Sequence, residues 1–248
     1  MRKTPFIILI WVFAIVLFYI CLQSINLEQT WNEFLKADPA WLFLAVFFNT
    51  CILGFWASLW RLLLPGNISV SFSRILQANS FMSTSCNTIP FPGGHAVGVM
   101  ALARRAEVGH TVALSVLALD QLMEGFAKIF VLTLVAIFVP LPDRMGQAII
   151  VFVVLIGIFA LTMFYLAHKK LSVQENKETI SFAGQLKNFV SRWSVHLEVL
   201  RDFRIFSLGL LLALVMMFAQ TLGIWAVQKS LGLDLPVWAP ILAMGALN

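Results

Sequence analysis

The chain has 248 residues, of which 60% are hydrophobic and only 12% are charged, with a formal net charge of +5. Its mean hydropathy of +0.89 excludes a single water-soluble core, because a domain of this length could not bury so much apolar surface. The sequence therefore predicts an all-α, polytopic integral membrane protein, since helices satisfy their own backbone polar groups within the bilayer.

The first predicted transmembrane helix covers residues 6–22 and follows Arg2 and Lys3. A cleavable signal peptide is the alternative interpretation of this segment. Its apolar run is longer than a typical signal core, however, and no small-x-small cleavage site follows it. We interpret it as a retained anchor. The second predicted span, residues 41–64, also has the ~20 apolar residues that a helical crossing requires.

Residues 73–105 are predicted to form a re-entrant helical hairpin. The sequence Pro90-Phe-Pro-Gly-Gly94 interrupts them, and a continuous helix is disfavoured there because proline lacks a backbone donor and glycine permits unusual dihedral angles. Irregular backbone at membrane depth is tolerated only where protein buries it or a cavity borders it. The alternative is a plain loop between two interfacial helices.

The second half of this hairpin is a candidate anion site. It begins just after Gly93 and Gly94 and has His95 in its first turn, so free N–H groups and the positive end of the helix dipole point at the break. A phosphate or carboxylate suits that geometry. Asn87 would add neutral hydrogen bonds. The structural alternative for His95 is a role in capping or packing the helix.

The third predicted span, residues 111–139, carries Asp120, Glu124 and Lys128 four residues apart on one helix face. Ionisable side chains at membrane depth are costly and often mark a substrate, ion or proton path. The structural alternative is that Glu124 and Lys128 satisfy one another as an i, i+4 pair, or that the charges pair with a neighbouring helix.

The rest of the chain adds two spans, residues 148–167 and 206–227. Between them, residues 179–204 carry apolar side chains at spacings of three and four, which predicts a cytoplasmic amphipathic helix in the headgroup region. Residues 236–248 begin a further apolar segment that is too short to span. We expect that the sequence is truncated within this segment.

A faint internal repeat supports that expectation. Sliding the sequence so that Gly66 aligns with Gly232 also aligns Ile75 with Ile241, without gaps. The helices that precede these matches run in opposite directions in the predicted topology, as an inverted repeat requires.

The distribution of Lys and Arg predicts that the N-terminus is cytoplasmic. Only Lys36, Arg144 and Lys229 then lie outside, and Lys128 lies within the membrane. The basic residues on the inside are Arg2, Lys3, Arg61, Arg74, Arg104, Arg105, Lys169, Lys170, Lys177, Lys187, Arg192, Arg201 and Arg204. The net charge is therefore a signature of topology, and no nucleic-acid partner is expected.

The sequence offers no sign of catalysis. Its three cysteines, Cys21, Cys51 and Cys86, lie in apolar or near-apolar segments and indicate no disulfide framework. We find no metal-ligand spacing, nucleotide loop or Cys-His pair. No enzymatic activity, metal or cofactor is expected.

The stretch from Arg74 through Asn87, Pro90, Gly93 and Gly94 to Arg104 and Arg105, followed by the acidic helix, resembles the lysylphosphatidylglycerol synthase transmembrane-region family. The resemblance implies a helical bundle with re-entrant helices that moves lipids between leaflets. Asp120-Gln121-Leu-Met-Glu124 departs from the usual family pattern, Glu-Arg-x-x-Asp, in having Gln where Arg is common.

These observations predict a flippase-like protein that translocates or binds an anionic or polyprenyl-linked lipid at the cytoplasmic membrane. The alternatives are a membrane subunit of a lipid-modifying or glycosyl-transferring system, and a scaffold that delivers lipid to a partner enzyme. The predicted substrate-binding residues are Asn87, Pro90, Gly93, Gly94, His95, Asp120, Glu124 and Lys128.

Overall fold

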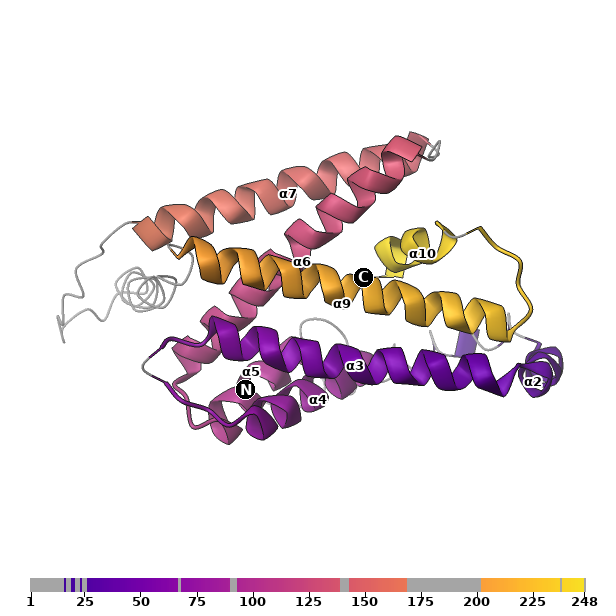
Figure 1. The fold of residues 1–248 in the computed structure, drawn as a ribbon, viewed down its shortest axis with the longest axis horizontal. Coiled ribbons are helices and arrows are strands. Elements are labelled where there is room, and N and C mark those ends of the chain that lie inside the picture. Colours follow the sequence, from indigo (N-terminus) through magenta and orange to yellow (C-terminus); the bar gives the residue numbers. More distant parts are fainter. Residues whose placement is uncertain are drawn as a thin grey trace.

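The computed structural model describes residues 16, 19, 20, 23, 26–66, 68–89, 93–138, 143–168, 202–236 and 238–247. The described residues are almost entirely helical and include no strand, which confirms the all-α class (Figure 1). The helices are α2 (Leu27–Lys36), α3 (Pro39–Leu63), α4 (Phe72–Thr88), α5 (Gly93–Arg105), α6 (His110–Phe138), α7 (Asp143–His168), α9 (Phe203–Ser230) and α10 (Ala239–Leu247). Four helices in the described part, α3, α6, α7 and α9, are long and apolar enough to cross a membrane.

Two predicted elements fall mainly beyond the described residues. These are the first span, residues 6–22, and the amphipathic helix, residues 179–204. The described end of the second one belongs to α9, because the Asp202 side chain caps that helix by accepting from the backbone N–H groups of Arg204 and Ile205. The sequence analysis did not predict α2.

Helices α3 and α9 lie side by side and antiparallel (Figure 1). At one end the Asp38 N–H donates to the Ser230 carbonyl at 2.9 Å. At the other end, a Cβ added to Gly209 would lie 3.5 Å from a Leu59 methyl carbon. Small buried residues recur along α9, among them Ala213, Gly223 and Ala226. Small side chains let two membrane helices approach closely, so van der Waals contact can hold the pair together.

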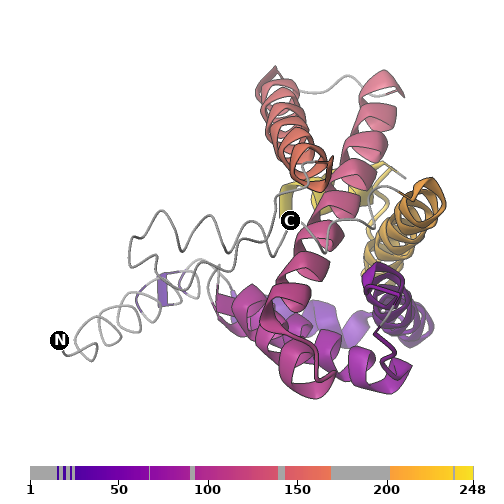
Figure 2. The ribbon, with the colours of Figure 1, turned by 90° about the vertical axis from the view of Figure 1, so that its left-hand side faces the viewer.

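Helices α4 and α5 form an antiparallel hairpin at one side of the molecule, with α7 at the other side and α6 running between them (Figure 2). Gly94 and Gly98 of α5 face α4 directly, against Cys86 and Met82 respectively. At the open end of the hairpin, the Arg105 guanidinium donates to the Gln77 amide oxygen at 2.8 Å. The same guanidinium lies over an aromatic ring of α4, that of Phe81, at 4.5 Å from the ring centroid.

Basic residues gather at the end of the molecule where the hairpin opens. Arg61 lies in the last turn of α3, Arg104 and Arg105 lie in the last turn of α5, and Arg204 lies in the first turn of α9. Figure 1 shows these helix ends at the same end of the bundle. The arrangement is the one that the predicted re-entrant hairpin requires, although its position relative to the membrane stays a prediction.

The inverted repeat also stays a prediction. In the sequence alignment that pairs Gly66 with Gly232, the bounds of α3 match those of α9, and the start of α4 matches the start of α10, each to within about two residues. Because α3 and α9 run in opposite directions, these bounds are compatible with the repeat.

Candidate functional site

A cavity of about 780 Å³ opens between α3, α4, α6 and α9, within the volume range of ligand-binding sites. Six of its lining residues are polar, and they come from all four helices. They are Asn49, Thr50, Ser83, Asn87, Glu124 and Gln220. The remaining lining residues are Leu42, Ala45, Val46, Ile52, Leu53, Trp56, Cys86, Met216 and Val227.

Two predicted site residues meet at this cavity, although they are far apart in the sequence. Asn87 lies in the last turn of α4, and Glu124 lies near the middle of α6. The Asn87 amide donates to the Ser83 carbonyl of the preceding turn at 3.0 Å, which orients that side chain. The hairpin and the acidic helix therefore contribute polar groups to the same cavity.

Glu124 is held by neighbours on its own helix. One carboxylate oxygen lies 2.8 Å from the Lys128 Nζ, and the other accepts from the Gln121 amide at 3.4 Å. The Lys128 side chain is 14% exposed, and it is absent from the lining of the cavity. The ion pair that the sequence offered as a structural alternative is therefore present, while Glu124 also borders the cavity.

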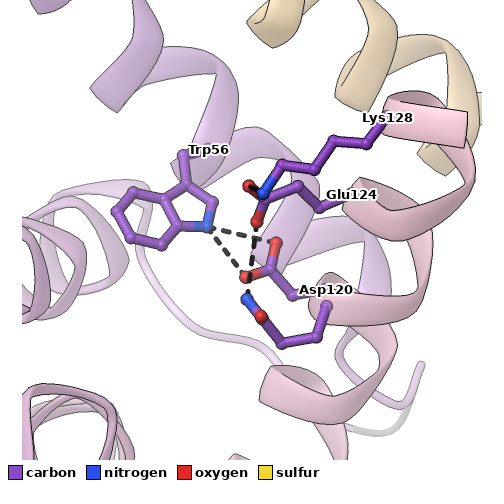
Figure 3. Close-up of polar contacts among 5 residues, drawn as sticks. Trp56, Asp120, Glu124 and Lys128 are labelled. Atoms are coloured by element: carbon purple, nitrogen blue, oxygen red, sulfur yellow. Dashed lines mark hydrogen bonds and ion pairs between the residues drawn. The ribbon is translucent and has the colours of Figure 1, made fainter. Parts of the chain in front are cut away.

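Asp120 has a different environment. The residue is only 1% exposed, and the indole N–H of Trp56 donates to both of its carboxylate oxygens at 3.1 Å (Figure 3). Trp56 lines the cavity, but Asp120 does not. The two carboxyl groups of α6 therefore differ in their access to the cavity: Glu124 lines it, and Asp120 lies behind an indole of α3.

The sequence as a whole matches one family model, the lysylphosphatidylglycerol synthase TM region, over residues 6–248. The chain belongs to the lysylphosphatidylglycerol synthase transmembrane-region family. Together with the four apolar helices, this membership identifies an integral membrane protein linked to lipid handling. No curated protein and no solved structure matches the chain.

In this family member, the start of α5 lies at the edge of the cavity and does not line it. Gly94 is packed so tightly that an added Cβ would lie 2.5 Å from the Cys86 Cα atom. The His95 Nδ1 atom lies 3.8 Å from the Cys86 sulfur, and Cys86 does line the cavity. Gly93 faces the Ile89 side chain. Pro90 lies outside the described residues.

Four further polar or aromatic lining residues were not predicted from the sequence of this family member. Three lie on α3, namely Asn49, Thr50 and Trp56, and Gln220 lies on α9. Their signal was available, because uncharged polar side chains inside otherwise apolar spans tend to face the bundle interior or a cavity. In the described residues no group of three or more His, Cys, Asp or Glu side chains could hold a metal ion.

Proposed function

We propose that this protein translocates a phospholipid or polyprenyl-linked lipid between the leaflets of the cytoplasmic membrane. The headgroup would pass through the cavity between α3, α4, α6 and α9. The observation that carries the proposal is that Asn87 of the hairpin and Glu124 of the acidic helix line this one cavity. A polar space among helices that are apolar enough to span a bilayer is what headgroup transfer needs, because hydrocarbon offers no hydrogen bonds.

The lining suggests which part of a headgroup would lie where. Glu124 is the only charged residue that lines the described cavity, so an ammonium or hydroxyl group would be placed beside it. The amides of Asn49, Asn87 and Gln220 offer both donors and acceptors for the neutral parts. A lipid phosphate would lie near the start of α5, next to Cys86, where the N-terminal N–H groups favour an anion.

The main test measures lipid exchange between leaflets in vesicles that contain the full chain. Fluorescent phospholipids in the inner leaflet are protected from a membrane-impermeant quencher until they are flipped. We expect the double substitution Glu124→Gln with Lys128→Gln to slow exchange about tenfold, as expected for the loss of a charged hydrogen bond worth roughly 1.5 kcal/mol. The double variant avoids leaving Lys128 unpaired in a poorly hydrated site.

The matched control is Glu33→Gln with Lys36→Gln, which removes an exposed ion pair from α2 at a distance from the cavity lining. Its exchange rate should equal that of the wild type. A second cavity variant, Asn87→Ala, should also slow exchange. Unchanged rates in both cavity variants would remove the proposed site. Formation of a modified lipid without leaflet exchange would favour the lipid-modifying alternative.

A further inference from the structure

Trp56 has two faces with different neighbours. Its ring lines the polar cavity between α3, α4, α6 and α9, and its indole N–H is turned toward Asp120 of α6 (Figure 3). The two donor–acceptor distances are equal, 3.1 Å to each carboxylate oxygen, so the N–H is shared by the whole carboxylate. The indole therefore stands between this carboxyl group and the cavity.

The side of Trp56 away from the cavity is closed by protein. Asp120 is 1% exposed, and Trp60, which packs edge-on against Trp56 with ring centroids 5.8 Å apart, is 0% exposed. In the described part of the chain no Lys, Arg or His nitrogen lies within 4.0 Å of the Asp120 carboxylate. The single Lys of this helix face, Lys128, is paired with Glu124.

We propose that Trp56 is a specificity-determining positioning residue that keeps Asp120 out of the cavity, so that a ligand meets one carboxylate, Glu124, where the sequence of α6 offers two. The proposal deepens the proposed function, since it takes this cavity to be the headgroup site. A cavity with one carboxylate suits a headgroup that carries a single ammonium group. Displacement of the indole would present a second negative charge and favour headgroups that carry two.

The physical reason lies in the cost of an unpaired polar group at membrane depth. The Asp120 carboxylate needs a hydrogen-bond donor, and the Trp56 N–H is one that comes from another helix. Trp56→Phe keeps an aromatic wall but removes this donor, so the carboxylate gains by turning toward the polar cavity. Trp56→Ala removes the wall as well.

The test is site-resolved labelling of carboxyl groups in lipid nanodiscs with an apolar carbodiimide, read by peptide mass spectrometry. We expect Asp120 in Trp56→Ala to react about tenfold or more faster than Asp120 in the wild type, with Trp56→Phe intermediate, since loss of the hydrogen bond and the wall costs roughly 1.5 kcal/mol or more. Comparing the same carboxylate across variants removes intrinsic differences between Asp and Glu.

The matched control is Trp41→Phe, since Trp41 lies in the first turn of the same helix, packs against Trp225 of α9 and does not line the cavity. This variant should leave the reactivity of Asp120 unchanged. Trp56→Phe also provides a variant that retains a folded bundle if Trp56→Ala does not. The proposal is overturned if Asp120 reacts equally fast in the wild type and both Trp56 variants, or if Trp41→Phe exposes it as much as Trp56→Phe does.

A second measurement links the labelling to the lipid. In the exchange assay, Trp56→Phe should raise the rate for a probe lipid with two ammonium groups relative to one with a single ammonium group, by about threefold or more, which corresponds to roughly 0.7 kcal/mol. An unchanged ratio, with Asp120 newly reactive, would overturn the role in specificity. The labelling result needs no transport, so a failure of the proposed function would leave it intact and would appear only in the exchange assay.

Discussion

Gly98 of α5 lies so close to Met82 of α4 that a Cβ atom on Gly98 would stand 2.5 Å from the Met82 sulfur. One turn earlier, a Cβ on Gly94 would meet the backbone of Cys86 at the same distance. The two glycines form a Gly-x-x-x-Gly spacing on one face of α5, which permits the close approach of the two helices. The hairpin therefore depends on the absence of side chains at these two positions.

We predict that Gly94→Ala destabilises the protein by about 1–3 kcal/mol, the usual cost of overpacking, because backbone atoms of α4 would have to move. Gly98→Ala should cost a similar amount, since the added Cβ would also lie 2.8 Å from the Met82 Cβ atom, which moves only with the backbone of α4. Thermal unfolding in detergent measures both. Gly54→Ala is the control, because a Cβ there meets nothing within 4 Å. Equal stability of Gly94→Ala and Gly54→Ala would contradict this account of the hairpin.

Asn79 offers a prediction of the opposite sign. It is 0% exposed on the buried face of α4, and neither its amide nitrogen nor its amide oxygen has a hydrogen-bond partner in the described structure. Replacing it by Leu, which has a similar shape, should stabilise the protein by about 1–3 kcal/mol, the cost of burying an unpaired polar group. Thermal unfolding of Asn79→Leu in detergent measures this change in stability. A loss of stability would instead show that the amide is hydrogen bonded in the membrane.

The predicted topology can be tested by cysteine labelling in intact cells. In a chain whose Cys21, Cys51 and Cys86 are replaced by Ser, a single cysteine at Glu33 should react with a membrane-impermeant maleimide added outside. Single cysteines at Ser71 and Glu107 should react only after the membrane is permeabilised, because a re-entrant hairpin returns to the cytoplasmic side. All three positions are exposed in the structure. If the cysteines at Ser71 and Glu107 react from opposite sides of the membrane, the segment between them crosses the membrane and does not form a re-entrant hairpin.

Much of the fold followed from local features of the sequence. Apolar runs of sufficient length predicted helices where α3, α6, α7 and α9 lie, because a spanning segment must satisfy its own hydrogen bonds. The Pro and Gly residues between α4 and α5 predicted the break, since both disfavour a continuous helix. Helix α2 was missed. It is short and polar on average, so hydropathy gives no signal for it.

The candidate site was only partly accessible from the sequence. Asn87 and Glu124 could be singled out as polar residues at membrane depth, and they do line one cavity. The partners that α3 and α9 contribute, such as Trp56 and Gln220, depend on which helices pack together. The anion site at Gly94 stays a prediction, and the close packing of Gly94 against α4 could not be predicted because it depends on which face of α5 meets that helix.

The sequence by itself determined that carboxylates would lie on one face of a membrane helix, because residues four apart differ by only about 40° around the helix axis. Only the tertiary structure decided that they have different roles. The same spacing also separates Asp120 and Glu124 by about 6 Å along the axis, so a different part of α3 and α9 stands opposite each. The indole of Trp56 lies opposite Asp120, whereas Glu124 borders the cavity.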